Sequence, residues 1–187
     1  ATPAAAAVLK GLEDQLRPHI GDYMYSDDGS TLEEQVVRLL AENQITLSLA
    51  EVSSGGSIAA SLTDVKNVAQ QILGGFVSTS DANLASILKM SKSELDQADP
   101  VSDSSAKAMA KRVRELLSSR WGLAVTEPHV SESGRSYVWL ALSKQEETFS
   151  SRRIYLRGQG QSMRNRLASS VLDSIRREFM AEKGPPN

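Results

Sequence analysis

The sequence contains no cysteine, and its 187 residues include only two histidines, His19 and His129. The missing thiols exclude disulfide bonds, thiolate metal sites and a cysteine nucleophile. Because the two histidines lie far apart in the chain, a histidine metal cluster is not indicated either. The sequence therefore predicts neither a metal nor a cofactor.

Long apolar runs and a strong excess of charge are also absent. No apolar stretch approaches the length of about 18 residues that a membrane-spanning helix needs, so no membrane association is predicted. The 21 Lys and Arg residues nearly balance the 23 Asp and Glu residues, and the net charge of −2 argues against a broad nucleic-acid-binding surface. A chain of this length with 40% hydrophobic residues fits one soluble globular domain, and we expect it in the cytoplasm or an equivalent soluble intracellular compartment.

Short apolar runs alternate with amphipathic segments along the chain. The apolar runs predict strands of one sheet over residues 45–50, 76–78, 123–126 and 137–142, with a further strand over 149–156 nearer an edge. The amphipathic segments predict helices over residues 4–17, 31–41, 57–62, 65–72, 103–117 and 162–179. We expect Pro18 to end the first helix, and Thr31 and Glu34 to form a capping box at the second. The alternation predicts an α/β fold: a layered αβα domain in which one mixed sheet carries helices on both faces.

Residues 45–62 join a predicted strand to a predicted helix through a turn of small side chains. Gly55 and Gly56 would let the backbone come close to a ligand. The hydroxyls of Ser53 and Ser54 can cap the helix that follows. Such a turn is typical of phosphate sites, but it is also typical of a plain capped turn, and both interpretations stay open.

Three stretches of the sequence carry a family resemblance. Residues 50–56 read Ala-Glu-Val-Ser-Ser-Gly-Gly, residues 73–84 read Leu-Gly-Gly-Phe-Val-Ser-Thr-Ser-Asp-Ala-Asn-Leu, and residues 100–110 read Pro-Val-Ser-Asp-Ser-Ser-Ala-Lys-Ala-Met-Ala. They resemble Ala-Glu-Ser-Cys-Thr-Gly-Gly, Leu-Gly-Gly-Val-Val-Ala-Tyr-Ser-Asn-Glu-Ala-Lys and Ala-Val-Ser-Glu-Glu-Thr-Ala-x-x-Met-Ala of the competence/damage-inducible CinA C-terminal domain and the stand-alone nicotinamide-nucleotide amidases. The resemblance extends from about Val8 to Phe179 and implies the CinA C-terminal fold.

The resemblance also implies a reaction, the hydrolysis of the carboxamide of nicotinamide mononucleotide. Such a reaction needs a nucleophile, a base and donors for the oxyanion. The positions of the family's serine nucleophile and its basic lysine hold Val52 and Leu84 here, and neither side chain can attack a carbonyl or hold a proton. The family's Gly-Ile-Ala-Gly-Pro run after Thr126 is replaced by residues 127–131, Glu-Pro-His-Val-Ser. We therefore predict that no catalytic set is intact, and that the domain has lost catalysis and serves interaction or assembly.

Two other interpretations stay open. Ser53 can be a shifted nucleophile in an active amidase, or the domain can bind nicotinamide mononucleotide or another phosphate ligand without catalysis. Six residues stand at positions that match the family: Glu51, Gly55, Gly56, Ser80, Thr126 and Arg164. Together with Ser53 and Ser54 they would form a ligand site. A local cluster of arginines is typical of a solvated face, or of a site for an anionic ligand or acidic partner; it consists of Arg152, Arg153, Arg157, Arg164 and Arg166.

The chain divides into three parts by its composition. Residues 1–29 are predicted to form a helix and an irregular, exposed connector that leads from a missing upstream domain. Residues 30–183 form the predicted α/β domain, and residues 184–187 form a frayed tail. The first helix carries a stripe of leucines that a partner is expected to cover. We therefore expect a homo-oligomer or a contact with the upstream domain.

Overall fold

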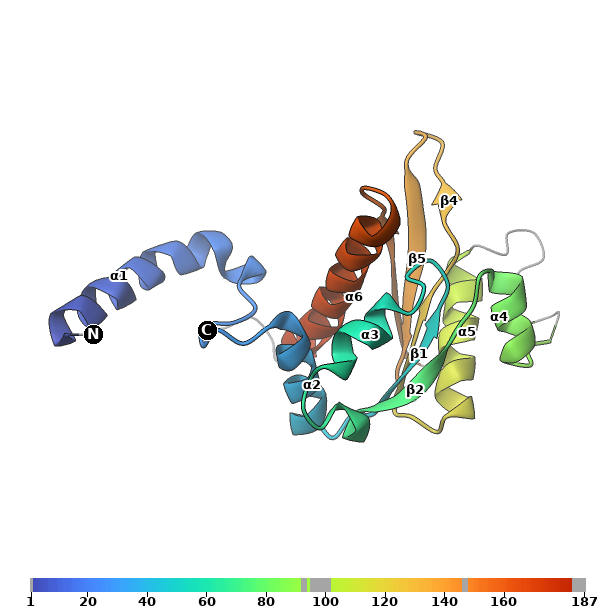
Figure 1. Cartoon of the computed structure of the whole chain (residues 1–187), viewed down its shortest axis with the longest axis horizontal. Helices are drawn as coiled ribbons and strands as arrows, with labels where there is room; N and C mark the ends of the chain where they lie inside the picture. The colour runs from blue at the N-terminus through green and yellow to red at the C-terminus, as the bar shows by residue number, and fades with distance from the viewer. Residues whose placement is uncertain (1, 92–93, 95–101, 146–147, 183–187) are drawn as a thin grey trace.

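The computed structural model describes residues 2–91, 94, 102–145 and 148–182, and every structural statement below concerns these residues. The predicted tail, residues 184–187, lies outside them. The described chain contains one six-stranded mixed sheet with helices on both of its faces (Figure 1). The layered α/β architecture that the alternation of strands and helices predicts is therefore confirmed.

The sheet has a parallel part and an antiparallel part. In chain order its strands are β1 (Leu47–Glu51), β2 (Ile72–Val77), β3 (Trp121–Val125), β4 (His129–Val130), β5 (Ser136–Ser143) and β6 (Phe149–Tyr155). β1 lies between β2 and β3 and is parallel to both, while β5 runs antiparallel to β3, β4 and β6. All four predicted central strands are thus present in one sheet, and β6 pairs only with β5, as expected for a strand at an edge.

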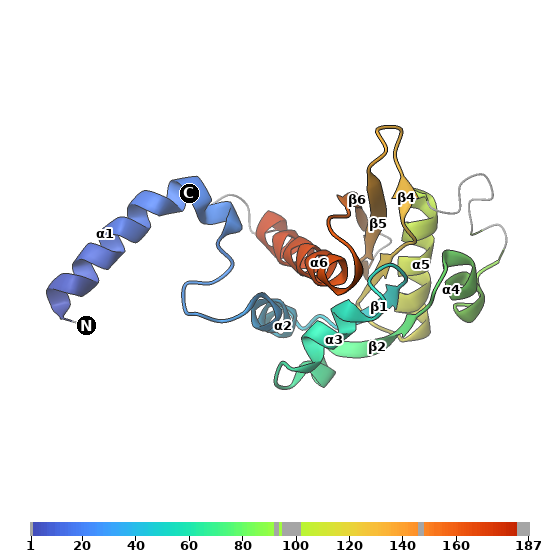
Figure 2. The ribbon, with the colours of Figure 1, turned by 45° about the horizontal axis from the view of Figure 1, so that its top comes forward.

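All helices except the first form two layers around this sheet (Figures 1 and 2). The helices are α1 (Pro3–Ile20), α2 (Leu32–Glu42), α3 (Ser57–Thr63), α4 (Asp81–Ile87), α5 (Asp103–Leu116) and α6 (Gly160–Glu182), and the 3-10 turns are η1 (Gly21–Tyr23) and η2 (Val68–Gln70). α2, α3 and α6 pack on one face, where large aliphatic side chains and the stacked rings of Trp121 and Phe179 form the core. α4 and α5 pack on the other face over small side chains, among them Ala50 and Ala124.

Two predicted element ends are wrong for simple steric reasons. Pro18 does not end the first helix, which continues to Ile20 and passes the proline at the cost of one backbone hydrogen bond. Residues 65–72 form only the short turn η2 instead of a helix, and β2 begins earlier than predicted, so that its two glycines lie inside the strand. A Cβ atom at Gly75 would lie 2.3 Å from the carbonyl oxygen of Leu49, so only glycine allows β2 to pair this closely with β1.

The capping box predicted at the start of α2 is confirmed. The Glu34 amide donates to the Thr31 hydroxyl at 3.2 Å, and the Thr31 amide donates to the Glu34 carboxylate at 2.8 Å. Two N-terminal donors of the helix are satisfied in this way. The cap therefore marks the point where the irregular connector ends and the packed domain begins.

The first helix stands away from the sheet and its covering helices in both views (Figures 1 and 2). Its apolar side chains are largely exposed, with exposed fractions from 41% to 64%: Val8, Leu9, Leu12, Leu16 and Ile20. The connector that follows is the turn η1 and then irregular, mostly exposed chain. The leucine stripe that the sequence predicts is thus present without a cover from the described part of the domain.

Substituting Gly75 with alanine should destabilise the domain. The added Cβ would meet the Leu49 backbone at 2.3 Å, and a backbone atom in a paired strand cannot move aside without loss of the pairing. We expect the free energy of unfolding to fall by at least about 2 kcal/mol, measured by urea denaturation. Gly11→Ala is the matched control because a Cβ there meets no atom within 4 Å, and an equal loss in both variants would contradict this explanation.

Candidate functional site

The turn between β1 and α3 is shaped by two consecutive residues with left-handed backbones. Gly55 has a φ of +57° and Gly56, the residue before α3, has a φ of +84°, and side chains disfavour both values. Directly before this turn, Glu51 is fully buried, and its carboxylate accepts hydrogen bonds from the amides of Ile58 at 3.2 Å and Ala59 at 2.9 Å. Glu51 therefore satisfies helix amides from inside the protein, where an anionic ligand would otherwise bind.

A shallow pocket lies over the outer side of the same turn, and we call it the Gly55 pocket. Its volume is about 390 Å³, and its lining residues are Gly55, Gly56, Ser57, Ala60, Gln161 and Arg164. Arg164 comes from the first turns of α6 and donates to the Gln161 side chain at 2.8 Å. The fold thus brings Arg164 to the glycine turn, as the resemblance implies, and places a guanidinium where a phosphate group could approach the backbone.

The positions of the family's nucleophile and base lie in an apolar environment. Val52 is 7% exposed and Leu84 is fully buried, and both belong to one cluster with Leu88 and Met109 on the α5 side of the sheet. The two side chains are therefore brought into the same region by β1 and α4. In that region Val52 and Leu84 share a cluster of buried apolar side chains.

Most hydroxyl groups of the predicted site form hydrogen bonds with other parts of the protein. The Ser53 hydroxyl donates to the carbonyl oxygen of Thr126 at 2.6 Å, and the Thr126 hydroxyl accepts from the Trp139 amide at 3.0 Å. Ser80 caps α4 by accepting from the Asn83 amide at 3.2 Å. Ser54 is different, because its buried hydroxyl has no partner among the described residues. Most of these groups hold turns and strand ends in place.

Two carboxylates that were given no role in the sequence interpretation meet at the same edge of the sheet. The Asp81 amide donates to the Glu127 carboxylate at 2.7 Å, and the Glu127 amide donates to the Asp81 carboxylate at 2.9 Å. Asp81 is 1% exposed, and its second carboxylate oxygen has no partner in the described chain. Burial raises the pKa of Asp81 to about 7, and the charge of Glu127 adds to the rise while the Glu127 amide opposes it.

The sequence motifs that carry the family resemblance already contain Asp81 and Glu127. Asp81 stands where the family has the asparagine of Ser-Asn-Glu-Ala-Lys, and Glu127 stands at the first glycine of Gly-Ile-Ala-Gly-Pro. Each position follows the end of a strand that is parallel to β1 and paired with it, so the two ends lie at one edge. Asp81 and Glu127 are thus two acidic residues that follow neighbouring strand ends.

No group of three or more His, Cys, Asp or Glu side chains that could hold a metal ion occurs in the described chain. Among the helices of the described residues, none is long and apolar enough to cross a membrane. The site therefore consists of a glycine turn with one arginine, an apolar region and an acidic pair.

The Asp81→Asn variant should change how stability depends on pH. The pKa of Asp81 is about 7 in the folded protein against an ordinary value of 3.8, so the folded state retains a proton that the unfolded state loses. Stability is therefore lost as the pH rises from about 4 to about 7, by roughly 4 kcal/mol for this group. Asparagine keeps the acceptor for the Glu127 amide and does not ionise.

We expect the Asp81→Asn variant to lose less stability than the unmodified chain between about pH 4 and about pH 8, in urea unfolding followed by circular dichroism. The exposed Asp64 provides the matched control Asp64→Asn. Identical pH dependence in the unmodified chain and the Asp81 variant would contradict the assignment.

Comparison with known proteins shows which family this chain belongs to. Residues 29–179 match the model of the CinA C-terminal domain. A putative competence-damage inducible protein of Thermoanaerobacter sp. (strain X514) is 32% identical over 181 residues, which cover 94% of this chain and 44% of that protein. A CinA-like protein of Acaryochloris marina (strain MBIC 11017) is 30% identical over 186 residues, with 96% and 44% covered. The chain thus spans less than half the length of these curated relatives.

Solved structures show the same fold. The CinA superfamily protein from Klebsiella pneumoniae 700603 superposes with a TM-score of 0.70 at 21% identity, and the match covers 80% of this chain and 96% of that one. The competence/damage inducible protein CihA from Agrobacterium tumefaciens has a TM-score of 0.65 at 19% identity, with 83% and 98% covered. With the family model matching residues 29–179 as well, the chain belongs to the CinA C-terminal domain family.

Proposed function

We propose that this chain is a CinA C-terminal domain that has lost amidase catalysis and serves interaction or assembly. The observation that carries the proposal is the packing of Val52 and Leu84 in one buried apolar cluster. In the family that the sequence resembles, these positions hold the nucleophile and the base. Replacing both members of a polar pair by apolar side chains can be nearly neutral for stability, which supports the interpretation of this cluster as part of the core.

The bonding of Ser53 argues against a shifted nucleophile. A serine attacks a carbonyl only when a neighbouring base takes its proton. Ser53 donates that proton to the backbone carbonyl of Thr126 at 2.6 Å, and a backbone carbonyl does not act as a base at neutral pH. No hydrogen bond within the described chain joins Ser53 to a basic side chain.

Binding without catalysis is the second candidate function. The Gly55 pocket combines a glycine turn with the guanidinium of Arg164, and no carboxylate is paired with that guanidinium in the described chain. Arginine recognises phosphate through paired hydrogen bonds. Nicotinamide mononucleotide or another phosphate ligand is therefore a reasonable occupant of this pocket.

The exposed face of α1 supports the proposed role in interaction. An isolated helix with five exposed apolar side chains in one stripe would be unfavourable in water. A second copy of the chain, or an upstream domain of a longer protein, can cover this stripe. The net charge of −2 gives the domain little electrostatic repulsion against a second copy.

We expect no measurable hydrolysis of nicotinamide mononucleotide by this chain. Removing one member of a nucleophile–base pair takes away most of the rate acceleration, and here both positions are apolar. The measurement is time-resolved detection of the nicotinic acid nucleotide, with an active family amidase as the positive control. Turnover at ordinary enzyme rates that is abolished by Ser53→Ala would overturn the proposal, while saturable binding without turnover would favour the second candidate.

Restoring the two side chains should not restore activity. The double variant Val52→Ser with Leu84→Lys still has Glu127 at the first of the family's glycine positions, bonded to the Asp81 amide. The new lysine would also place a charge in the apolar cluster of α4 and α5, which lowers stability. The same product assay tests this variant, and circular dichroism shows whether it is folded.

Replacing leucines in the apolar stripe of α1 with serine should reduce the molar mass of the protein in solution. The Leu9→Ser and Leu12→Ser changes affect side chains that are 62% and 51% exposed, so the domain itself should stay folded. If a second copy covers the stripe, light scattering will show a smaller mass for the double variant than for the unmodified chain. The control is Val130→Ser, which alters an apolar side chain that is 60% exposed in β4. A monomer mass for the unmodified chain would rule out self-association.

A further inference from the structure

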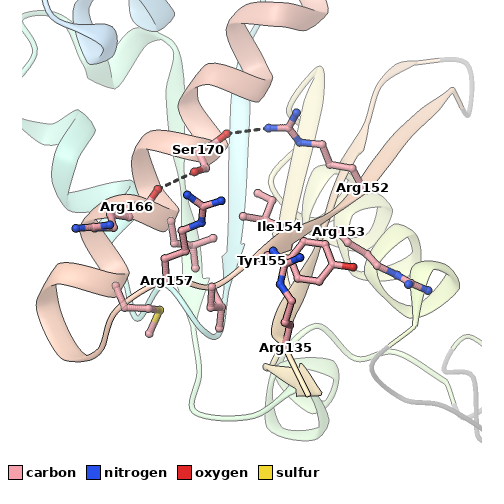
Figure 3. Close-up of a pocket in the computed structure, with 11 residues that line it drawn as sticks. Arg135, Arg152, Arg153, Ile154, Tyr155, Arg157, Arg166 and Ser170 are labelled. Carbon is pink, nitrogen blue, oxygen red and sulfur yellow. Dashed lines mark hydrogen bonds between the residues drawn. The ribbon is translucent and has the colours of Figure 1, made fainter. Parts of the chain in front are cut away.

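A second pocket lies at the other side of α6, between this helix and the edge strand β6 (Figure 3). Its volume is about 380 Å³, and none of its lining residues is acidic. We call it the arginine pocket after the five arginines that line it: Arg135, Arg152, Arg153, Arg157 and Arg166. It shares no lining residue with the Gly55 pocket.

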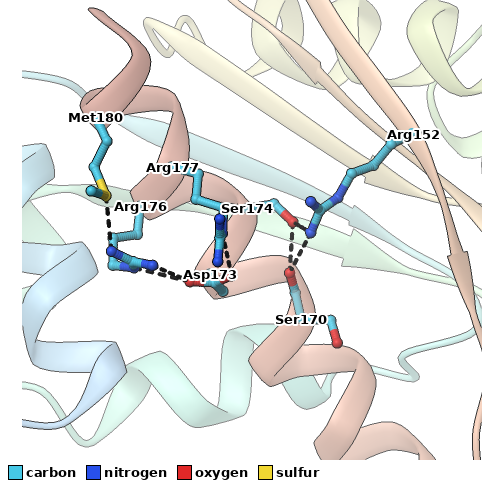
Figure 4. A network of polar contacts seen from close by, with 7 residues as sticks. All are labelled: Arg152, Ser170, Asp173, Ser174, Arg176, Arg177 and Met180. Atoms are coloured by element: carbon cyan, nitrogen blue, oxygen red, sulfur yellow. Dashed lines mark hydrogen bonds and ion pairs between the residues drawn. The ribbon is translucent and has the colours of Figure 1, made fainter. Parts of the chain in front are cut away.

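The charge of this pocket contrasts with the charge of the chain. The whole sequence has a net charge of −2, yet five arginines and no carboxylate line this pocket. The neighbouring Asp173 on α6 offsets part of the charge of Arg152, but it does not line the pocket, and Arg176 and Arg177 each donate a hydrogen bond to it at 2.7 Å (Figure 4). Like charges in one depression repel one another, so the pocket attracts an anion.

Arg152 is held in place inside the pocket. It extends from β6 to α6 and donates to the carbonyl oxygen of Ser170 at 3.1 Å and to the hydroxyl of Ser174 (Figure 4). Partial burial lowers the pKa of this guanidinium, so an anion beside it would offset the loss of hydration. A positioned charge loses little side-chain entropy when a ligand binds.

Two further arginines are held by aromatic rings. Arg135 lies 4.1 Å from the ring centre of Tyr155 at the rim of the pocket, and its N–H groups remain available because the ring contacts only the face of the guanidinium. Arg153 lies 4.9 Å from the ring centre of Tyr137 and points away from Arg157 (Figure 3). Arg153 therefore adds charge to the region rather than a direct ligand contact.

Arg157 and Arg166 complete the pocket with free side chains. Neither guanidinium makes a hydrogen bond or an ion pair within the described chain, and Arg157 points into the space between α6 and β6 (Figure 3). Arg157 follows β6 and Arg166 lies on α6, so the two charges approach the pocket from different elements. A ligand that contacts both must present more than one anionic group or one group with several acceptors.

We propose that the arginine pocket binds a small anion that carries at least two phosphate groups. Arg157 and Arg166 can each donate paired hydrogen bonds to phosphate oxygens. Arg152 contributes its charge and the donors that Ser170 and Ser174 do not take. A single phosphate would neutralise only part of this charge, whereas a diphosphate carries enough negative charge for all three. This binding is separate from any ligand at the Gly55 pocket and does not depend on the loss of catalysis.

Calorimetric titration of the whole chain with inorganic pyrophosphate tests the proposal. We expect one saturable site, weaker binding of orthophosphate, and weakening by added salt. The double variant Arg157→Gln with Arg166→Gln should bind pyrophosphate at least roughly tenfold more weakly, because two charge-assisted contacts are removed. These side chains are exposed and unpaired, so thermal unfolding should stay unchanged. Titration with ADP and with adenosine then distinguishes a nucleotide from an inorganic diphosphate.

Two controls locate the binding. Arg38→Gln removes a surface arginine that pairs with Asp28 and does not line the pocket, and it should leave the affinity for pyrophosphate unchanged. Arg164→Gln removes the guanidinium of the Gly55 pocket, two positions from Arg166 in the sequence. Absence of pyrophosphate binding, or a loss that is as large in Arg38→Gln or Arg164→Gln as in the double variant, would overturn the proposal.

Discussion

The burial of β1 on both faces is the constraint on which the rest of the structure depends. All five residues of this strand are buried, and it is paired with β2 and β3 along its length. Leu47 and Leu49 belong to the core under α2, α3 and α6, while Ala50 belongs to the cluster under α4 and α5. A strand that is enclosed in this way presents only its end to solvent, and the glycine turn therefore becomes the natural place for a ligand.

The same burial explains the chemistry of the candidate site. The cluster under α5 continues past the end of β1 and includes Val52 and Leu84. The acidic pair of Asp81 and Glu127 closes the same edge through mutual bonds to backbone amides. Apolar packing and internal hydrogen bonds thus determine the structure at this end of the sheet.

The arginines of the two pockets lie on either side of α6, and none of them belongs to the apolar cluster of Val52 and Leu84. Arg164 faces the glycine turn, and Arg166, two residues later, faces the pocket beside β6. Because a helix turns by about 100° per residue, two positions separate these side chains by roughly half a turn. One helix therefore supplies cations to two separate surfaces, and the α1 stripe offers a third surface of apolar character.

The sequence by itself determined the layered α/β fold, the four central strands and the capping box at Thr31, because these depend on local periodicity and on contacts between near neighbours. It also determined that positions 52 and 84 carry apolar side chains, since this depends on residue identity alone. The tertiary structure alone decided where each strand begins, because the start of β2 depends on the space that Gly75 leaves beside Leu49. It alone brought Asp81 to Glu127, and Arg152 and Arg157 to Arg166, because such pairs lie far apart in the chain or on different elements and meet only when the sheet and its helices have packed.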